Sequence, residues 1–350
     1  MIVKNEAHCI VKCLESVKNY IDYWIVCDTG STDGTQEIIK NYMRDVPGEL
    51  HQHDWVDFST NRNKALKLAE SNGDYILVID ADDYLVCQSS DAFKELSAPA
   101  YRINFKHANI TYQRVQLFKS NVGAKYIGVL HEYLDLPGNI IQEELLDCYI
   151  QYGALGARSQ DPDKFLKDAK IFEEELKKDS SNSRNVFYCA QSYRDARKPE
   201  SALSFYIKRS EMGGWSEEVY VSLLEAAKII EKLFEDNPLV VQSSYLRAIN
   251  YLPARSEAIY YLCLFCRKNK LFEHSYNFAK LGIDNKVPTS GLFVEPDCYN
   301  WKIQEELGLA AYYIGKQKEF EDITKSLLKN PHVPKHEADR IKGNIKYFKY

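Results

Sequence analysis

Long apolar runs and an excess of positive charge are both missing from this sequence. No window reaches the roughly 18 uncharged apolar residues that a membrane-spanning helix needs, so no transmembrane segment is predicted. Lys4 and Glu6 bring charge directly after a short apolar start, which is not the pattern of a secretory signal. The net charge of −5 argues against a nucleic-acid-binding protein, because such proteins usually present a basic face.

A cysteine framework is missing as well. The nine cysteines are an odd number and lie scattered along the chain, without the spacing of disulfide-rich domains. This pattern predicts reduced thiols and a cytoplasmic protein. Cys263 and Cys266 form a lone C-x-x-C without two further ligands nearby, so we expect them to pack in a core rather than to bind zinc.

The sequence has enough apolar residues for two domains. It contains 350 residues, of which 45% are hydrophobic and 27% charged. These proportions are ordinary for soluble globular proteins, and a domain takes roughly 100–200 residues. Each half of the chain can therefore bury a core of its own.

Strand and helix patterns alternate over the first 152 residues. Residues 23–27 (YWIVC) and 75–79 (YILVI) are continuous apolar runs, as in strands that are buried on both faces. Helical spacing occurs at residues 7–20, 34–43 and 58–71. Shorter strands are expected at residues 50–53, 101–105, 113–118 and 125–130. The alternation predicts parallel βαβ units in a Rossmann-like α/β domain, in which ligands bind beyond the carboxyl ends of the strands.

Helix follows helix after about residue 161. Two segments share small and larger residues at the same offsets of 0, 3, 12 and 16: Ala190, Tyr193, Ala202 and Tyr206, then Cys263, Cys266, Ser275 and Ala279. Small residues at offsets 0 and 12 let two antiparallel helices approach closely, as in a tetratricopeptide repeat. We therefore predict an α/β domain over residues 1–155 and an all-α, tetratricopeptide-like domain over residues 156–350. Such repeats could bind a protein partner, mediate a homodimer or only brace the first domain.

Carboxylates follow both apolar strands. Asp28 opens the run DTGSTDGT, and Asp80, Asp82 and Asp83 follow residues 75–79. Three carboxylates within four residues repel one another unless a cation is bound, and clustered oxygen ligands suit Mn²⁺ or Mg²⁺. The alternatives are a capped loop without a ligand around Asp28, and a solvated acidic turn after the second strand.

Two further motifs carry candidate functional groups. Arg62, in WVDFSTNRN, is expected near the start of a helix, where Ser59 or Thr60 could be the cap. A cation there opposes the helix dipole, so a diphosphate contact explains Arg62 better than helix stability does. His131 and Glu132 follow an apolar strand; they could bind a metal and act as a general base, or be an ordinary surface pair.

These motifs, in this order, resemble the inverting family 2 glycosyltransferases of the GT-A fold. The motifs are MIVKNE, DTGSTDGT, W-x-D-F-S-x-x-R-N, DADD and HE, and the resemblance covers residues 1 to about 135. The branch with W-x-x-F-x-x-x-R-N and a terminal HE includes lipopolysaccharide-core sugar transferases. It also includes bacterial peptide S-glycosyltransferases with C-terminal tetratricopeptide repeats.

The resemblance implies a nucleotide-diphospho-sugar donor, with UDP as the expected nucleotide, and a glycan, lipid or polypeptide acceptor. An acceptor hydroxyl or thiol would displace the nucleoside diphosphate in one inverting step. The implied nucleotide-sugar contacts are Val3, Glu6, Asp28, Asp33, Arg62 and Asp80. The implied ligands of Mn²⁺ (or Mg²⁺) are Asp82, Asp80 and His131, and the catalytic candidates are Glu132 and Asp83.

Two other functions compete with this interpretation. One is a repeat-based scaffold with an inactive transferase-like domain, which would have no physical reason to keep Asp80, Asp82 and Arg62. The other is a nucleotidyltransferase, which usually has a glycine-rich, basic loop after its first strand. The segment from Lys4 to Glu6 has no glycine, so a glycosyltransferase is favoured.

Overall fold

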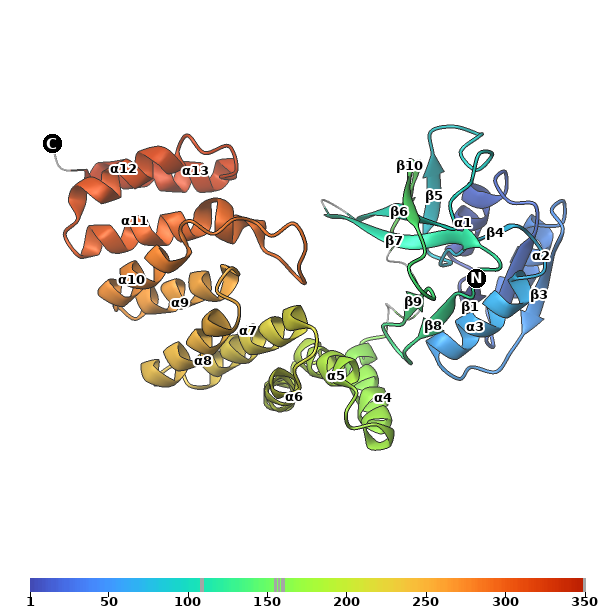
Figure 1. The fold of residues 1–350 in the computed structure, drawn as a ribbon, viewed down its shortest axis with the longest axis horizontal. Coiled ribbons are helices and arrows are strands. Elements are labelled where there is room, and N and C mark those ends of the chain that lie inside the picture. The colour runs from blue at the N-terminus through green and yellow to red at the C-terminus, as the bar shows by residue number, and fades with distance from the viewer. Residues whose placement is uncertain (108–109, 154–155, 157, 159–160, 349–350) are drawn as a thin grey trace. The chain divides into compact units, whose positions relative to one another are not determined.

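The computed structural model describes residues 1–350 except 108–109, 154–155, 157, 159–160 and 349–350 (Figure 1). The chain divides into two compact units, Met1–Ile171 and Phe172–Tyr350. The division falls inside helix α4 (Lys164–Lys178), whereas the sequence pattern predicts a boundary between residues 155 and 156.

The first unit begins with the predicted parallel βαβ arrangement. Strands β1 (Ile2–Val3), β2 (Trp24–Asp28) and β3 (Gly48–Gln52) form a parallel sheet in that order. Helix α1 (Ile10–Val17) connects β1 to β2, and α2 (Thr35–Tyr42) connects β2 to β3. The strands and helices predicted for residues 7–53 are therefore confirmed, with the ends shifted by a few residues.

A second sheet departs from the prediction. It has the order β4-β7-β6-β10-β5. Its strands are β4 (Tyr75–Leu77), β5 (Tyr84–Cys87), β6 (Ala100–His107), β7 (Ile110–Lys119) and β10 (Gln142–Gln151). Strand β4 pairs antiparallel with β7, so the expectation that the run 75–79 belongs to a parallel βαβ unit is wrong. Apolar composition showed that β4 is buried, but it could not show the direction of its neighbour.

Some strands gave no clear sequence pattern. Strand β10 was not predicted, although it is ten residues long. It buries Leu145, Cys148 and Ile150 but exposes Leu146, so its apolar residues do not mark one face. Strands β8 (Lys125–Ile127) and β9 (Tyr133–Asp135) form a small antiparallel sheet, and α3 (Phe58–Ala69) lies between β3 and β4 in the chain.

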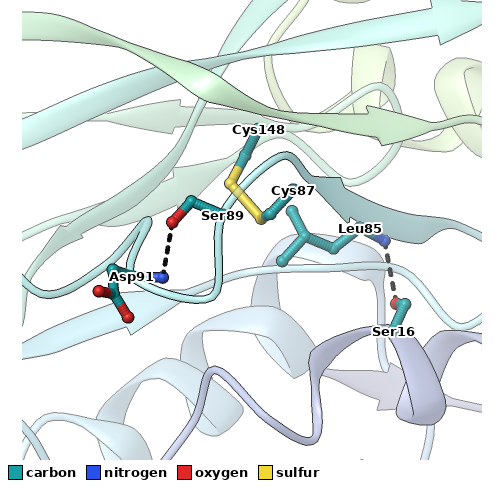
Figure 2. The surroundings of a disulfide bond; sticks show 6 residues. All are labelled: Ser16, Leu85, Cys87, Ser89, Asp91 and Cys148. Carbon is teal, nitrogen blue, oxygen red and sulfur yellow. Dashed lines mark hydrogen bonds between the residues drawn. A yellow bond between two sulfur atoms is a disulfide. The ribbon is translucent and has the colours of Figure 1, made fainter.

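One cysteine pair corrects the prediction of reduced thiols. Cys87 on β5 and Cys148 on β10 form a disulfide, although they lie 61 residues apart in sequence (Figure 2). The antiparallel register places these two residues directly opposite each other, which only the pairing of β5 with β10 could reveal. The other seven cysteines are buried. The cysteines therefore do not by themselves indicate a reducing compartment.

The second unit consists of successive helices. After α4 these are α5 (Ser183–Asp195), α6 (Pro199–Glu211), α7 (Ser216–Leu233), α8 (Pro238–Tyr251), α9 (Glu257–Lys268), α10 (Phe272–Gly282), α11 (Ile303–Tyr313), α12 (Gln317–Leu327) and α13 (Lys335–Lys342). None of the helices in the described part of the chain is both long enough and apolar enough to cross a bilayer.

The predicted repeat positions fall on paired helices. Ala190 on α5 and Ala202 on α6 are completely buried, as the close approach of two helices requires. Cys263 on α9 is buried and its thiol donates to the carbonyl oxygen of Ser275 on α10 at 3.5 Å, so the expected packing role of the C-x-x-C is confirmed. The chain thus has an α/β domain followed by a tetratricopeptide-like helical region, as predicted.

Candidate functional site

Two loops at the carboxyl end of the parallel sheet are tied together by side chains. The loop after β1 donates from the backbone N–H groups of Glu6 and Ala7. The acceptors are Thr35 Oγ1 at 2.9 Å and Asp33 Oδ2 at 3.0 Å, both just after β2. Asn5, which precedes Glu6 in the first loop, has a positive φ of 59°, a strained conformation that is common at functional sites. These hydrogen bonds join the two loops into one rim.

Asp28 lies on this rim with one oxygen in need of a partner. The residue is completely buried. Its Oδ1 accepts from the backbone N–H groups of Gly30 and Ser31, both at 2.9 Å, and from Gln36 Nε2 at 3.0 Å. Its Oδ2 is buried and has no hydrogen-bond partner among the described residues. A buried acceptor without a partner is costly, so a ligand N–H or O–H group would be favourable there.

Val3 and Asp33 lie next to Asp28, but their acceptor groups bind within the protein. The carbonyl oxygen of Val3 accepts from the N–H and the hydroxyl of Thr29, at 2.9 and 3.0 Å. Asp33 Oδ1 accepts from Thr35 N and Oγ1. Burial opposes the charge on Asp33, but its hydrogen bonds to Thr35 and Ala7 outweigh this and lower the pKa of the carboxyl group. Both residues therefore hold the rim in place.

Arg62 bridges two of the predicted carboxylates. It projects from α3, and its Nη2 donates to Asp80 Oδ1 at 2.8 Å while its Nε donates to Glu132 Oε1 at 2.6 Å. The guanidinium also lies 5.5 Å from the ring centroid of Tyr126. The structure therefore brings Arg62, Asp80 and Glu132 together from three separate segments. The cap of α3 is Asp57 rather than the predicted Ser59 or Thr60, because the Asp57 side chain accepts from the backbone N–H of Thr60.

The charges of this bridge stabilise one another. Burial opposes the charge on Arg62, but the negative charges of Asp80 and Glu132 outweigh it and raise the pKa of the guanidinium. Burial likewise opposes the charge on Asp80, and the charge and hydrogen bond of Arg62 outweigh it and lower the pKa of the carboxyl group. Asp80 is thus held ionised beside a fixed cation.

Asp82 and Asp83 hold two glycines that follow β10, which we call the glycine pair (Gly153 and Gly156). Asp83 Oδ1 accepts from Gly153 N at 3.1 Å, and Asp82 Oδ2 accepts from Gly156 N at 2.9 Å. A Cβ atom on Gly153 would lie 1.6 Å from the backbone oxygen of Asp82, so only glycine fits there. Burial, reinforced by the charges of Asp80 and Asp82, raises the pKa of Asp83 to about 7 although its bond to Gly153 opposes this.

The predicted metal ligands are not gathered around one point. Asp80 faces Arg62, and His131 is an exposed residue with a positive φ of 49°. Asp82 Oδ1 accepts no hydrogen bond from the residues that the structure describes, and a carboxylate oxygen is a suitable ligand for Mn²⁺ or Mg²⁺. Asp82 therefore fits such an ion, and Asp80 offers a second carboxylate near it in sequence.

Another set of ligand atoms lies closer together. Within the described ranges, Glu6, His8 and Cys9 place one ligand atom each within 4.8 Å of the others. The thiol of Cys9 donates to Glu6 Oε2 at 3.1 Å. Burial, together with the hydrogen bond and charge of Glu6, raises the pKa of Cys9 to about 12. Because a metal binds the thiolate, this set is a poor metal site.

Sequence reasoning missed Tyr126 and the glycine pair. Tyr126 lies below Arg62, and no motif marked it. The spacing of Gly153 and Gly156 was visible as G-x-x-G. Only the structure shows that this spacing brings the two glycines against Asp82 and Asp83.

Comparisons with known proteins identify relatives of parts of this chain. Residues 1–87 match the model of glycosyl transferase family 2. The SPbeta prophage-derived glycosyltransferase SunS of Bacillus subtilis is 29% identical over 226 residues, which are 60% of this chain and 52% of that protein. A TPR repeat-containing protein of Synechococcus elongatus is 34% identical over 144 residues, 39% of this chain and 34% of that protein. The resemblance to family 2 glycosyltransferases is confirmed for the N-terminal domain.

These matches are partial. The chain spans about a third to a half of the length of the curated relatives it matches. The crystal structure of MamA, with 16% identity and a TM-score of 0.39, covers 48% of this chain and 88% of that one. A likeness at this TM-score carries no inference about function.

Proposed function

We propose that this chain, whose first 87 residues match glycosyl transferase family 2, transfers a sugar from a nucleotide-diphospho-sugar to an acceptor with inversion. One observation carries the proposal: the buried, unpartnered Oδ2 of Asp28 lies at the carboxyl end of β2, within the matched segment. In open α/β sheets, this is where ligands bind. A nucleoside offers N–H and O–H groups that this oxygen could accept.

The donor's nucleoside and diphosphate would use different residues. Asp28 would accept from the base or the ribose, and Glu6 lies on the same rim. We favour UDP, whose base carries an N–H group that a carboxylate can accept. Arg62 would bind the diphosphate, because a guanidinium matches two phosphate oxygens. Asp82 and Asp80 would hold Mn²⁺ (or Mg²⁺), with His131 as a further contact; such an ion, when bound, offsets the charge of the leaving diphosphate.

The acceptor step needs a base. We propose that Glu132 removes the proton from an acceptor hydroxyl or thiol, which then attacks the anomeric carbon from the face opposite the leaving group. The side chain of Glu132 is 11% exposed and lies beside Arg62 at 2.6 Å. Asp83 is the second candidate, but it is only 3% exposed and is bound to Gly153. Glu132 is therefore better placed to reach an acceptor.

We propose that the helical region binds a partner molecule. It exposes large apolar side chains, among them Leu239, Leu281 and Phe293, which are 77%, 60% and 56% exposed. Helical repeats commonly bind extended partners on such surfaces. We propose that this region binds a protein partner, or the acceptor itself if the acceptor is a polypeptide; a glycan or a lipid acceptor would be bound by the first domain alone.

The test is UDP binding by calorimetry to the wild type and to Asp28→Asn. The exchange removes the charge that strengthens the hydrogen bond, and such bonds are worth about 1.5–3 kcal/mol. We expect the dissociation constant to rise about 10- to 100-fold. Asp236→Asn is the matched control, because Asp236 is an exposed residue of the second unit. Equal affinity of all three proteins, or no UDP binding by the wild type, would overturn the proposal and favour a scaffold with an inactive domain.

A further inference from the structure

Three successive residues of α3 reach three different parts of the first unit. Consecutive residues of an α-helix project about 100° apart around its axis. Asn61 accepts from Val56 N at 2.9 Å and donates to the carbonyl oxygen of Asp54 at 3.0 Å, so it holds the loop before the helix. Arg62 makes the ion pairs of the candidate site. Asn63 reaches strand β8 instead.

The side chain of Asn63 binds both backbone groups of Tyr126 on β8. Its Nδ2 donates to the carbonyl oxygen of Tyr126 at 2.9 Å, and its Oδ1 accepts from the N–H of Tyr126 at 2.8 Å. A side-chain amide offers one acceptor and two donors, so it can pair with a backbone as another peptide group does. Within the described ranges, β8 has β9 as its one strand partner. Asn63 therefore takes the place of a neighbouring strand at the other edge of β8.

Strand β8 leads directly into the turn that carries Glu132. This turn joins β8 to β9, and two of its residues have positive φ angles, 105° at Gly128 and 49° at His131. A second bond ties it to α3, because Phe58 at the start of the helix donates its N–H to the carbonyl oxygen of Val129 at 3.3 Å. The position of Glu132 relative to α3 is therefore set by backbone contacts with that helix.

Glu132 needs an anchor other than Arg62 if it is to act as a base. The two side chains are joined at 2.6 Å, but a donor diphosphate would compete for the guanidinium. Glu132 would then lose its direct link to α3. The two bonds of Asn63, at 2.8 and 2.9 Å, are shorter than the 3.3 Å bond of Phe58 and involve no charge that a diphosphate would displace. They would keep the turn in place during this exchange of partners.

We propose that Asn63 is a positioning residue for sugar transfer: it clamps the backbone of Tyr126 and so holds the Glu132 turn against α3 while Arg62 binds the donor. Asn63 acts through the backbone and touches neither donor nor acceptor. Catalytic groups lose much of their effect when they are displaced by about 1 Å. The inference rests on the proposed function, in which Glu132 is the base.

The test is Asn63→Ala, assayed by release of UDP from UDP-glucose, UDP-galactose and UDP-N-acetylglucosamine with water in place of the acceptor. On the sugar nucleotide that the wild type hydrolyses fastest, we expect kcat to fall about 10- to 100-fold. The dissociation constant for UDP, measured by calorimetry, should stay within a few-fold. Amide exchange over residues 125–135 should become at least about 10-fold faster, because an edge of β8 is released.

The matched control is Asn61→Ala, which removes an asparagine of the same helix that also makes two backbone hydrogen bonds. It should lower the unfolding midpoint by a similar amount but leave kcat and the exchange of residues 125–135 unchanged. A second comparison asks whether Asn63 acts through Glu132. In a Glu132→Gln background, adding Asn63→Ala should lower kcat by no more than about 2-fold, because two changes that remove one contribution are not additive.

Three outcomes would overturn the proposal: an unchanged kcat in Asn63→Ala, an equal loss of kcat in Asn61→Ala, or a full further loss in the Glu132→Gln background. The last would mean that Asn63 acts independently of Glu132. A wild type that hydrolyses none of the three sugar nucleotides would instead overturn the proposed function, and with it the role of Asn63 in catalysis. The exchange measurement separates these cases, since it reports the contact with β8 whether or not sugar is transferred.

Discussion

At the scale of single residues, the site is a balance of buried charges. Arg62 already has two carboxylate partners, Asp80 and Glu132, within 2.8 Å. A diphosphate would compete with these carboxylates for the guanidinium. Donor binding should therefore loosen the bond between Arg62 and Glu132 and leave Glu132 available to an acceptor. This exchange of partners would couple donor binding to activation of the base.

The base assignment can be tested by two isosteric changes. If Glu132 is the base, Glu132→Gln should lower kcat of sugar transfer by about 10²–10⁴-fold, the usual contribution of general-base catalysis. UDP affinity measured by calorimetry should stay within a few-fold. Asp83→Asn is the matched comparison, because its amide oxygen can still accept from Gly153. A large loss of kcat in Asp83→Asn with little loss in Glu132→Gln would assign the base to Asp83 instead.

At the scale of elements, the acidic loop (Asp82 and Asp83) is connected to two neighbouring strands of the five-stranded sheet, β5 and β10. The loop with Asp82 and Asp83 leads into β5, and the glycine pair follows β10. Strands β5 and β10 are neighbours and are also linked by the disulfide of Cys87 and Cys148. Leu85 of β5 donates its N–H to Ser16 of α1 at 2.9 Å (Figure 2). The acidic loop is thus fixed from several sides.

The glycine pair should be intolerant of a side chain. Gly153→Ala would place a Cβ atom 1.6 Å from the Asp82 backbone oxygen, so the chain must shift. We expect a loss of about 1–3 kcal/mol in the free energy of unfolding, as for other overpacked sites, and weaker UDP binding. Gly343→Ala is the control, because nothing lies within 4 Å of its added Cβ. Unchanged stability and binding in Gly153→Ala would show that this contact is dispensable.

The disulfide should stabilise the first unit. Replacing both cysteines, in Cys87→Ser with Cys148→Ser, removes a crosslink that closes a long loop and should cost about 2–4 kcal/mol. Thermal unfolding with and without a thiol reductant measures this. Reductant should lower the midpoint of the wild type toward that of the double variant and leave the double variant unchanged. A wild type insensitive to reductant, with a double variant of equal stability, would contradict this role.

At the scale of the whole molecule, the two units have separate cores. Residues Met1–Ile171 and Phe172–Tyr350 form two compact units, and such units often unfold separately. The helical unit depends on small residues where helices approach closely, such as Ala190 and Ala202, which are fully buried. The sequence offsets that identified these positions therefore reflect packing.

This separation predicts a local response to overpacking. Ala202→Leu should lower the unfolding midpoint of the helical unit, because extra methyl groups in a packed interface cost about 1–3 kcal/mol. The transition of the first unit should not move. Ser204→Leu, at an exposed position of the same helix, is the control and should leave both transitions in place. Calorimetry resolves the two transitions, and equal shifts in both would mean that the units unfold together.

Local patterns determined much of this protein. Apolar runs gave β2 and β4, helical spacing gave α1 to α3, and the repeat offsets gave the paired helices, because these features depend on residues close in sequence. The order of motifs indicated the family of the N-terminal domain. It also selected Asp28, Arg62 and Asp80, which the structure places at strand ends and in an ion-paired site.

Other features were decided only by tertiary structure. The antiparallel partner of β4, the disulfide between Cys87 and Cys148, and the contact of the glycine pair with the acidic loop all join segments far apart in sequence. The same holds for Arg62 and Glu132, which are separated by 70 residues. Local patterns report which faces are buried, whereas the identity of the partner depends on how the whole chain closes on itself. For this reason the sequence predicted individual helices and strands but not which of them would lie side by side.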